Sequence, residues 1–459
     1  MCKRLFVLAA LLMFAAPVMA AVGVFDFQAD IGHDVDWGNP LGIGSTVYIH
    51  PDEYLITAGG NDIWGQHDGM HYAYNEVSGS VRIEGSMRWQ DSGWNDWTKG
   101  GVMLRESLAS GSIQYSTLIR KGGNRNPWEA YGKSGDGAFF QHRQNTNGDS
   151  GGSGDRWQEG PQKVAIQRIN MGFGGYEIIQ SLVDYGSGWE VVGNKTGWLL
   201  ADDLLVGIGL TSGDNADMKQ FIASNVVYTL NPGLVNYPIP PTVPGDVKVE
   251  NCGTTQRGFN IRSIFLGEDI AWGYGGMNQL LDGLVEGYDE GSRVEQFVNL
   301  HDSDGRGVFE NDQSFPGIDA FQQPTGNPAD GDNDDSFATE ITACIELIAG
   351  RHLFAINSDD GAQVWIGGVF VGQTTEWKGA STEYIMFDVA EAGSYSLTVR
   401  HLEGGGGASL ELMEVLADGT HVLMNDVANG ASAVYVPEPA TIALLGFGGL
   451  AMLRVRRKR

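Results

Sequence analysis

The sequence predicts an all-β protein, and three observations support this fold class. The 459-residue chain contains 67 glycines, about twice the usual share, which favours many tight turns. Its 12 Trp, 15 Tyr and 19 Phe favour strands over helices. Apolar or small residues alternate with polar ones along residues 81–89, as expected for a strand with one buried face. Residues 164–168 and 206–210, bounded by Gly-rich breaks, are predicted to form two more strands, so an antiparallel sandwich is the simplest arrangement.

The N-terminal segment has the pattern of a secretory signal peptide. Lys3 and Arg4 precede an apolar core, and small residues that end at Ala20 provide a cleavage site. We therefore expect residues 1–20 to be removed on export and exclude them from the fold.

The C-terminal segment combines a proline-rich motif, an apolar run and a basic tip. Val436-Pro437-Glu438-Pro439 precedes 14 uncharged residues, 440–453, and the chain then ends in a basic cluster. The prolines stop a helix from running in from upstream. The run is shorter than the roughly 20 residues of a usual membrane span, but the basic tip can stay on the cytoplasmic side. We expect a short membrane helix here, and the alternative is a buried terminal helix.

This order of features resembles the PEP-CTERM sorting signal over residues 436–459. The resemblance implies that a Gram-negative bacterium exports the protein to its cell envelope, its surface or the extracellular matrix. It also implies an exosortase, a membrane-embedded processing enzyme, as a partner, and membrane contact through the C-terminal helix before processing. The residues that would carry the signal are Pro437, Glu438, Pro439, Arg454, Arg456 and Arg457.

Charge and cysteine content limit the possible partners. The net charge is −28, and the region between the two terminal segments is more acidic still because both segments are basic. Such a surface repels nucleic acid, attracts divalent cations and favours solubility. Cys252 and Cys344 remain after removal of the signal peptide and can form a disulfide in an oxidising compartment or stay reduced. The chain has no C-x-x-C motif, which argues against a zinc or redox site.

A proline-rich segment divides the chain. Five prolines lie within residues 231–245, NPGLVNYPIPPTVPG, and predict a stiff, extended linker. We therefore expect one β domain at 21–230, a second at 246–415 and a spacer at 416–435.

The first domain resembles concanavalin A-like, laminin G-like jelly rolls of exported bacterial proteins. The resemblance implies a jelly-roll sandwich but says little about function, because this fold supports many functions. The matching stretches are Asp62-Ile63-Trp64-Gly65, Met70-His71-Tyr72-Ala73-Tyr74, residues 99–107, Gly188-Trp189 and residues 207–212.

Several patterns in this domain suggest chemistry. Gly148-Asp149-Ser150-Gly151-Gly152 matches a serine-protease nucleophile loop, but the matching histidine motif is absent and we expect a flexible loop. His67 and His71 have a metal-ligand spacing that needs a helix, which nearby glycines oppose, so we expect packed, hydrogen-bonded histidines. Glu106 stands beside Arg105 and suggests a structural ion pair. Trp94 and Trp97 lie in a polar loop, where exposed rings could stack on sugars; the alternative is that they belong to the core.

The second domain resembles the PA-14 domain, a β-barrel or sandwich. The resemblance covers about two thirds of it and depends on Ser358-Asp359-Asp360-Gly361, on G-x-Y-x-L-x-V-x-H from Gly393 to His401, and on residues 406–412. In lectins of this family two successive aspartates bind Ca²⁺, which implies a calcium site at Asp359 and Asp360. The late loop offers Glu403 and Gly404–Gly407 but no matching Asn. The alternative is that the aspartates only cap a turn.

These features together predict an exported, non-enzymatic surface or matrix protein that binds an extracellular polysaccharide or other glycan. The alternatives are a polysaccharide-active enzyme, which needs two carboxylates in one cleft, and a purely structural or adhesive surface protein.

Overall fold

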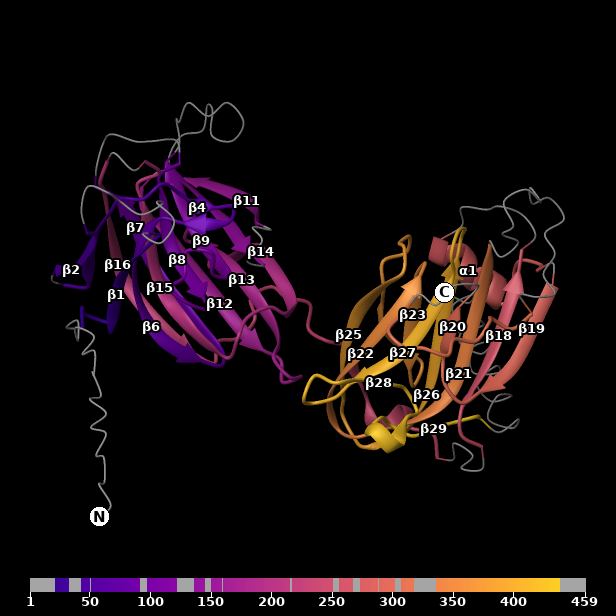
Figure 1. Cartoon of the computed structure of the whole chain (residues 1–459). Helices are drawn as coiled ribbons and strands as arrows, with labels where there is room; N and C mark the ends of the chain where they lie inside the picture. The colour runs from indigo at the N-terminus through magenta and orange to yellow at the C-terminus, as the bar shows by residue number, and fades with distance from the viewer. Residues whose placement is uncertain are drawn as a thin grey trace, which may run out of the picture. The chain divides into compact units, whose positions relative to one another are not determined.

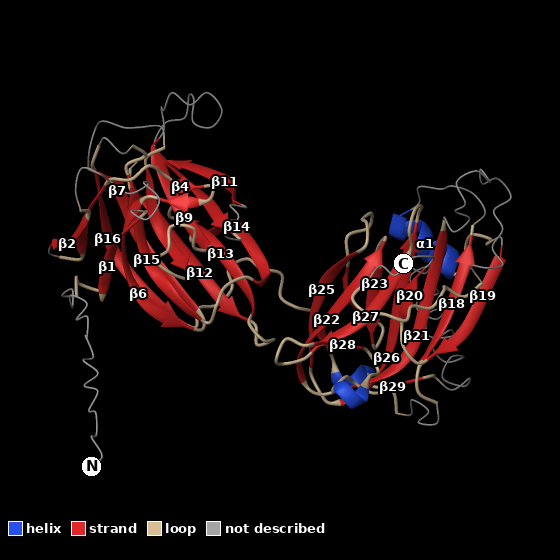
Figure 2. Ribbon diagram, viewed as in Figure 1, coloured by secondary structure: helices blue, strands red, loops and turns tan. Residues whose placement is uncertain are grey.

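The computed structural model describes residues 21–32, 43–49, 51–90, 97–121, 136–144, 150–158, 160–214, 217–250, 256–266, 273–287, 289–301, 307–317 and 336–437. The predicted all-β class is confirmed, because strands make up nearly all the regular structure of these residues (Figures 1 and 2). The chain forms two compact units, with the boundary between Tyr237 and Pro238.

The first unit is a sandwich of two seven-stranded antiparallel sheets. In order across the sheet, the first sheet contains β1 (Phe27–Ile31), β6 (Met70–Ser78), β15 (Asp203–Thr211), β8 (Lys99–Arg105), β9 (Gln114–Lys121), β10 (Asp136–Arg143) and β11 (Ser150–Gln158). The second contains β14 (Trp189–Trp198), β13 (Tyr176–Asp184), β12 (Gln162–Asn170), β7 (Val81–Trp89), β16 (Lys219–Leu230), β3 (Glu53–Ala58) and β2 (Ser45–Ile49). A small hairpin, β4 (Ile63–Trp64) and β5 (His67–Asp68), adjoins them.

The hydrophobic core of the first unit lies between these two sheets. Val102 and Ile208 come from one sheet, Ile83 and Val164 come from the other, and all four are fully buried in one cluster. The predicted strand at 81–89 is confirmed as β7, whose residues alternate between buried and partly exposed as the pattern requires.

The second unit also contains two sheets. The first has the order β17 (Thr242–Val243), β25 (Ser381–Val389), β22 (Gly350–Asp359), β27 (Ser409–Val415) and β20 (Asn299–His301), and β28 (His421–Leu423) pairs with β27. The other has the order β19 (Asp289–Glu295), β18 (Phe259–Phe265), β21 (Phe337–Leu347), β26 (Gly393–Glu403), β23 (Ala362–Ile366) and β24 (Val369–Gln373), and β29 (Val434–Tyr435) pairs with β21. Their inner faces share one core, to which Ile356 and Val399 contribute.

The second unit contains a short helix, although the composition favours strands over helices. Helix α1 (Gly273–Leu281) contains three glycines, which disfavour helix in isolation. Its Tyr274, Met277 and Leu280 are nevertheless buried together against the sheet. Tertiary packing therefore outweighs the low local propensity.

The segment that connects the two folded units is shorter than the linker predicted at residues 231–245. Gln180 holds residue Val235 on the first unit, since its Nε2 donates to the Val235 carbonyl (2.8 Å) and its Oε1 accepts from the Val235 N–H (3.0 Å). On the other side, Thr242–Val243 form β17 and pair with β25 in the second unit. Both ends of the 231–245 segment are thus part of the folded units.

The expected spacer at 416–435 is instead part of the second unit. It contains β28, the short helix η4 (Val427–Asn429) and β29, and Met424 and Val434 belong to the core. The domain extends beyond 415 because apolar residues continue past β27 and complete the sandwich.

Two other expectations concern the same units. Ser150-Gly151-Gly152 lie in strand β11 and pair with β10. The expectation of a flexible loop is therefore wrong for these three residues. Cys344 is disulfide-bonded; Cys252, its predicted partner, lies outside the described residues.

No helix of the described residues is long and apolar enough to cross a membrane, and the run at 440–453 also lies outside them.

Candidate functional site

The ends of two strands bring three carboxylates together in the second unit. Asp359 is the last residue of β22, and Glu403 is the last residue of β26. One carboxylate oxygen from each of Asp359, Asp360 and Glu403 lies within 4.8 Å of the other two. The strand ends are joined by the Leu402 N–H, which donates to the Gly361 carbonyl at 2.8 Å.

All three carboxylates are buried. The exposed fractions of Asp359, Asp360 and Glu403 are 7%, 8% and 0%, and the peptide bond between the two aspartates is cis. Burial of several like charges at such short distances is unfavourable unless a cation compensates them. The structure therefore brings both predicted residues together with Glu403.

Backbone groups of two loops orient Asp360. Its Oδ1 accepts from the Lys378 N–H at 3.0 Å, and its Oδ2 accepts from the Gly404 N–H at 3.1 Å. A carboxylate oxygen has a second lone pair that can still reach an ion. Burial raises the pKa of Asp360 above its usual value, against the opposing effect of these two N–H groups.

Two basic side chains adjoin the carboxylates, and only one adds a full positive charge. The Lys378 ammonium donates to the Ser381 carbonyl at 2.7 Å, and burial lowers its pKa. His401 is fully buried, and its Nε2 lies 2.8 Å from the Asp359 carbonyl. Burial lowers the pKa of His401 to about 4, so the ring is neutral at pH 7 and its Nε2–H donates to that carbonyl. Three carboxylates thus face one ammonium.

The donor set fits a hard cation. Ca²⁺ prefers six to eight oxygen ligands at about 2.3–2.6 Å and favours carboxylates and backbone carbonyls. The three carboxylates supply such oxygens, and their charge exceeds that of Lys378. The described site contains no thiolate, which argues against a soft metal.

An exposed tryptophan stands beside the carboxylates. Trp377 lies in the loop between β24 and β25 and is 44% exposed. Its ring covers Gly404 so closely that a Cβ at Gly404 would come within 2.3 Å of it. The sequence analysis did not identify Trp377. Its loop is nevertheless polar, like the loop of Trp94 and Trp97, and reads Thr375-Glu376-Trp377-Lys378-Gly379.

Trp94 and Trp97, the predicted sugar-stacking residues, belong to the first unit. Trp97 precedes β8 and is 49% exposed, whereas Trp94 lies outside the described residues. His71 is buried, and its Nδ1 lies 2.8 Å from Asp30 Oδ1, as expected for a packed histidine. His67 contacts the Ser110 hydroxyl at 3.3 Å.

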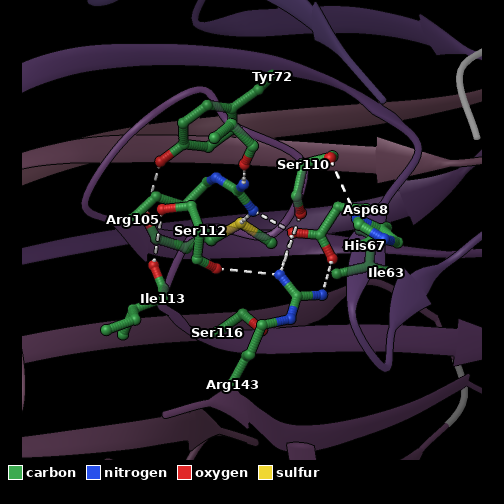
Figure 3. A network of polar contacts seen from close by, with 12 residues as sticks. Ile63, His67, Asp68, Tyr72, Arg105, Ser110, Ser112, Ile113, Ser116 and Arg143 are labelled. Atoms are coloured by element: carbon green, nitrogen blue, oxygen red, sulfur yellow. Dashed lines mark hydrogen bonds and ion pairs between the residues drawn. The ribbon is translucent and has the colours of Figure 1, made fainter. Parts of the chain in front are cut away.

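The expected ion pair between Arg105 and Glu106 is wrong. Glu106 accepts from the Ala201 N–H at 2.9 Å, whereas Arg105 and Arg143 both bind Asp68 (Figure 3). Arg143 Nη2 lies 2.6 Å from Asp68 Oδ1, and all three side chains are 0% exposed. This cluster attaches the β4–β5 hairpin to β8 and β10 and is structural.

A second fully buried ion pair in the first unit predicts a pH effect. Arg168 binds Glu177, and the Leu200 N–H donates to Glu177 Oε1 at 2.7 Å. Burial raises the pKa of Glu177 to about 7, against the opposing effect of Arg168. The folded state therefore holds a proton that the unfolded state releases near pH 4.5, and stability should fall as pH rises from about 4.5 to about 7.

Replacing Glu177 by Gln should remove that slope. Hydrogen exchange of first-unit peptides across this pH range, corrected for intrinsic exchange rates, measures it. An unchanged slope in Glu177→Gln would contradict the assignment.

Comparison with known proteins identifies the C-terminus. Residues 436–458 match the PEP-CTERM protein-sorting motif. The chain carries this sorting signal, which indicates an exported protein that is processed at the cell envelope. The match includes the six predicted signal residues, of which only Pro437 lies within the described structure, where it is buried.

Solved structures with similar chains include sugar-binding proteins. They include a PA14 sugar-binding domain from an RTX adhesin (18% identity, TM-score 0.28, 37% of this chain and 96% of that one). The epithelial adhesin 9 A domain from Candida glabrata, in complex with Galβ1-3GlcNAc, is 10% identical (TM-score 0.28, 44% and 98%). Lectin UEA-II, complexed with galactose, is 12% identical (TM-score 0.27, 45% and 100%). No curated protein sequence matched this chain.

Proposed function

We propose that this PEP-CTERM protein is an exported, non-enzymatic surface or matrix protein whose second unit binds carbohydrate through a calcium ion. The observation that carries the proposal is the convergence of Asp359, Asp360 and Glu403 in a buried cluster. The sorting motif supports export, with an exosortase as the processing partner in a Gram-negative cell envelope.

The residues around the cluster suit a glycan. A calcium ion there would offer open coordination positions that neighbouring sugar hydroxyls can fill, because it accepts six to eight oxygen ligands. Trp377 is half exposed beside Gly404 and presents an aromatic ring on which the apolar face of a sugar can stack. The ion would supply affinity for hydroxyls, and the ring would select for sugar shape.

A glycan array tests the proposal with the full chain in calcium or in EDTA. We expect binding to at least one glycan in calcium, and loss of that binding in EDTA and in Asp359→Asn. Asp388→Asn is the matched control, because Asp388 is a partly exposed aspartate of the same unit paired with Arg351. Retention of binding in EDTA, or no binding to any glycan, would overturn the proposal. Turnover of a bound polysaccharide would show an enzyme instead.

Replacing Trp377 by Ala should weaken glycan binding without weakening calcium binding. Loss of aromatic stacking on a sugar removes about 1 kcal/mol, or roughly a fivefold to tenfold change in Kd. Titration calorimetry with the array-identified glycan and with calcium separates the two affinities. If Trp377→Ala leaves glycan affinity unchanged, the ring has no part in the site.

A further inference from the structure

The sorting signal begins directly on a folded strand. β29 pairs with β21, with Cys344 opposite Tyr435 and Ile345 opposite Val434. Val434 is fully buried in the core. The Val436 N–H donates to the Gln256 carbonyl at 2.9 Å, and Val436 is the first residue of the matched motif. No flexible segment separates the domain from the signal.

Asn425 fixes this end of the unit. It is 3% exposed. Its Oδ1 accepts from the Val434 N–H at 3.1 Å and from Arg257 Nε at 2.8 Å, and its Nδ2 donates to the Gln296 carbonyl at 2.8 Å. These bonds tie the last strand to two other segments, so β29 is held in the fold rather than lying loosely on it.

Glu403 of the carboxylate cluster lies at the opposite end of the same sheet. In the β21–β26 pairing, Phe337 stands opposite Glu403, while β29 joins β21 at Cys344, seven residues further along. At about 3.4 Å per residue, this is roughly 24 Å. In Figure 1, β29 lies at the lower end of the second unit, and α1 lies at the upper end.

We infer that the end of the second unit that carries β29 faces the membrane in the unprocessed protein, so that the Asp359–Asp360–Glu403 end faces away from it. The inference rests on the membrane helix that the sequence predicts at residues 440–453. Only four residues, 436–439, separate the anchored strand from the apolar run that starts at Ala440, and they span at most about 14 Å. The glycan site is thereby presented outward before processing.

Site-specific fluorescence quenching tests this orientation. Residues 21–459, which lack the signal peptide and keep the whole sorting signal, are reconstituted in phosphatidylethanolamine–phosphatidylglycerol vesicles that contain headgroup-labelled nitroxide lipid. Two matched variants, Ala428→Cys in η4 and Ala380→Cys in the loop after Trp377, replace exposed alanines at the two ends. Both are labelled without reductant, so that the disulfide of Cys344 stays intact.

We expect quenching at position 428 to exceed that at 380 several-fold. A third variant with a long Gly-Ser insertion between Val436 and Pro437 should float with the vesicles but lose this difference. Equal quenching at both positions, or stronger quenching at 380, in protein that floats would overturn the orientation. Protein that does not float would overturn the membrane helix and with it the orientation, while calcium binding by the same samples reports on the proposed glycan site independently.

Discussion

Replacing Asp68 by Asn is expected to lower the free energy of unfolding of the first unit by about 3–5 kcal/mol. Asp68 is the carboxylate shared by Arg105 and Arg143, and none of the three side chains has exposed surface. The substitution leaves two guanidinium groups in the interior without a counter-charge. Such an uncompensated buried charge costs more than the net contribution of the intact pair.

Backbone carbonyls moderate this cost without removing it. Arg143 also donates to the carbonyls of Gly65 (2.7 Å) and Ser112 (3.0 Å), and Arg105 donates to that of Ala109 (2.7 Å). These dipoles hold the two guanidinium groups in place in the variant. They carry no net charge, so the stability loss should remain large.

Native-state hydrogen exchange with peptide resolution measures the effect on the full chain. Peptides of the second unit serve as an internal reference. Glu53→Gln is the matched control, because it breaks a partly exposed pair with Arg88 (3.3 Å) and should cost under about 1 kcal/mol. A loss as small as the control's would mean that the carbonyls alone satisfy both arginines. Combining Asp68→Asn with Arg105→Met and Arg143→Met should recover much of the loss, since no buried charge would then remain in this cluster.

The Asp68 cluster also shows where sequence reasoning reaches its limit. The strand at 81–89 could be predicted, because alternation is a local property that fixes which face is buried. The partner of Arg105 could not, since Asp68 lies 37 residues away and only the sheet register brings them together. Pairing Arg105 with Glu106 failed because adjacent residues of an extended chain point to opposite sides.

Only part of the candidate site could be predicted from the sequence. Asp359 and Asp360 could be named from a short motif, but Glu403 joins them only because β22 and β26 end side by side. Trp377 could have been predicted by the argument used for Trp97, because it too is an aromatic residue in a polar loop. Its position over Gly404 depends on the fold of two loops that are distant in the sequence, so the sequence alone does not indicate it.

Calcium is expected to stabilise the second unit selectively. At a calcium concentration about 100 times the Kd, binding to the native state alone adds about 2.7 kcal/mol to the free energy of unfolding. Magnesium should add less, because it demands a tighter octahedral shell. The gain should shrink in acid, since the ligands must be deprotonated. Peptide-resolved exchange in calcium, magnesium and EDTA measures it.

Glu403→Gln separates a metal site from a simple acidic turn by the sign of its effect. In a metal site this variant should abolish the calcium-dependent gain. In EDTA it should stabilise the unit slightly, because it removes one of three like charges whose oxygens lie within 4.8 Å. The Gly405 N–H, which donates to Glu403 Oε1 at 2.7 Å, can still donate to the Gln amide oxygen. If the carboxylates only cap backbone N–H groups, Glu403→Gln should instead destabilise the unit equally with and without calcium, because a charged acceptor becomes a neutral one. That second pattern would rule out the calcium site, because the loss of a calcium ligand must change the stability of the unit by different amounts with and without calcium.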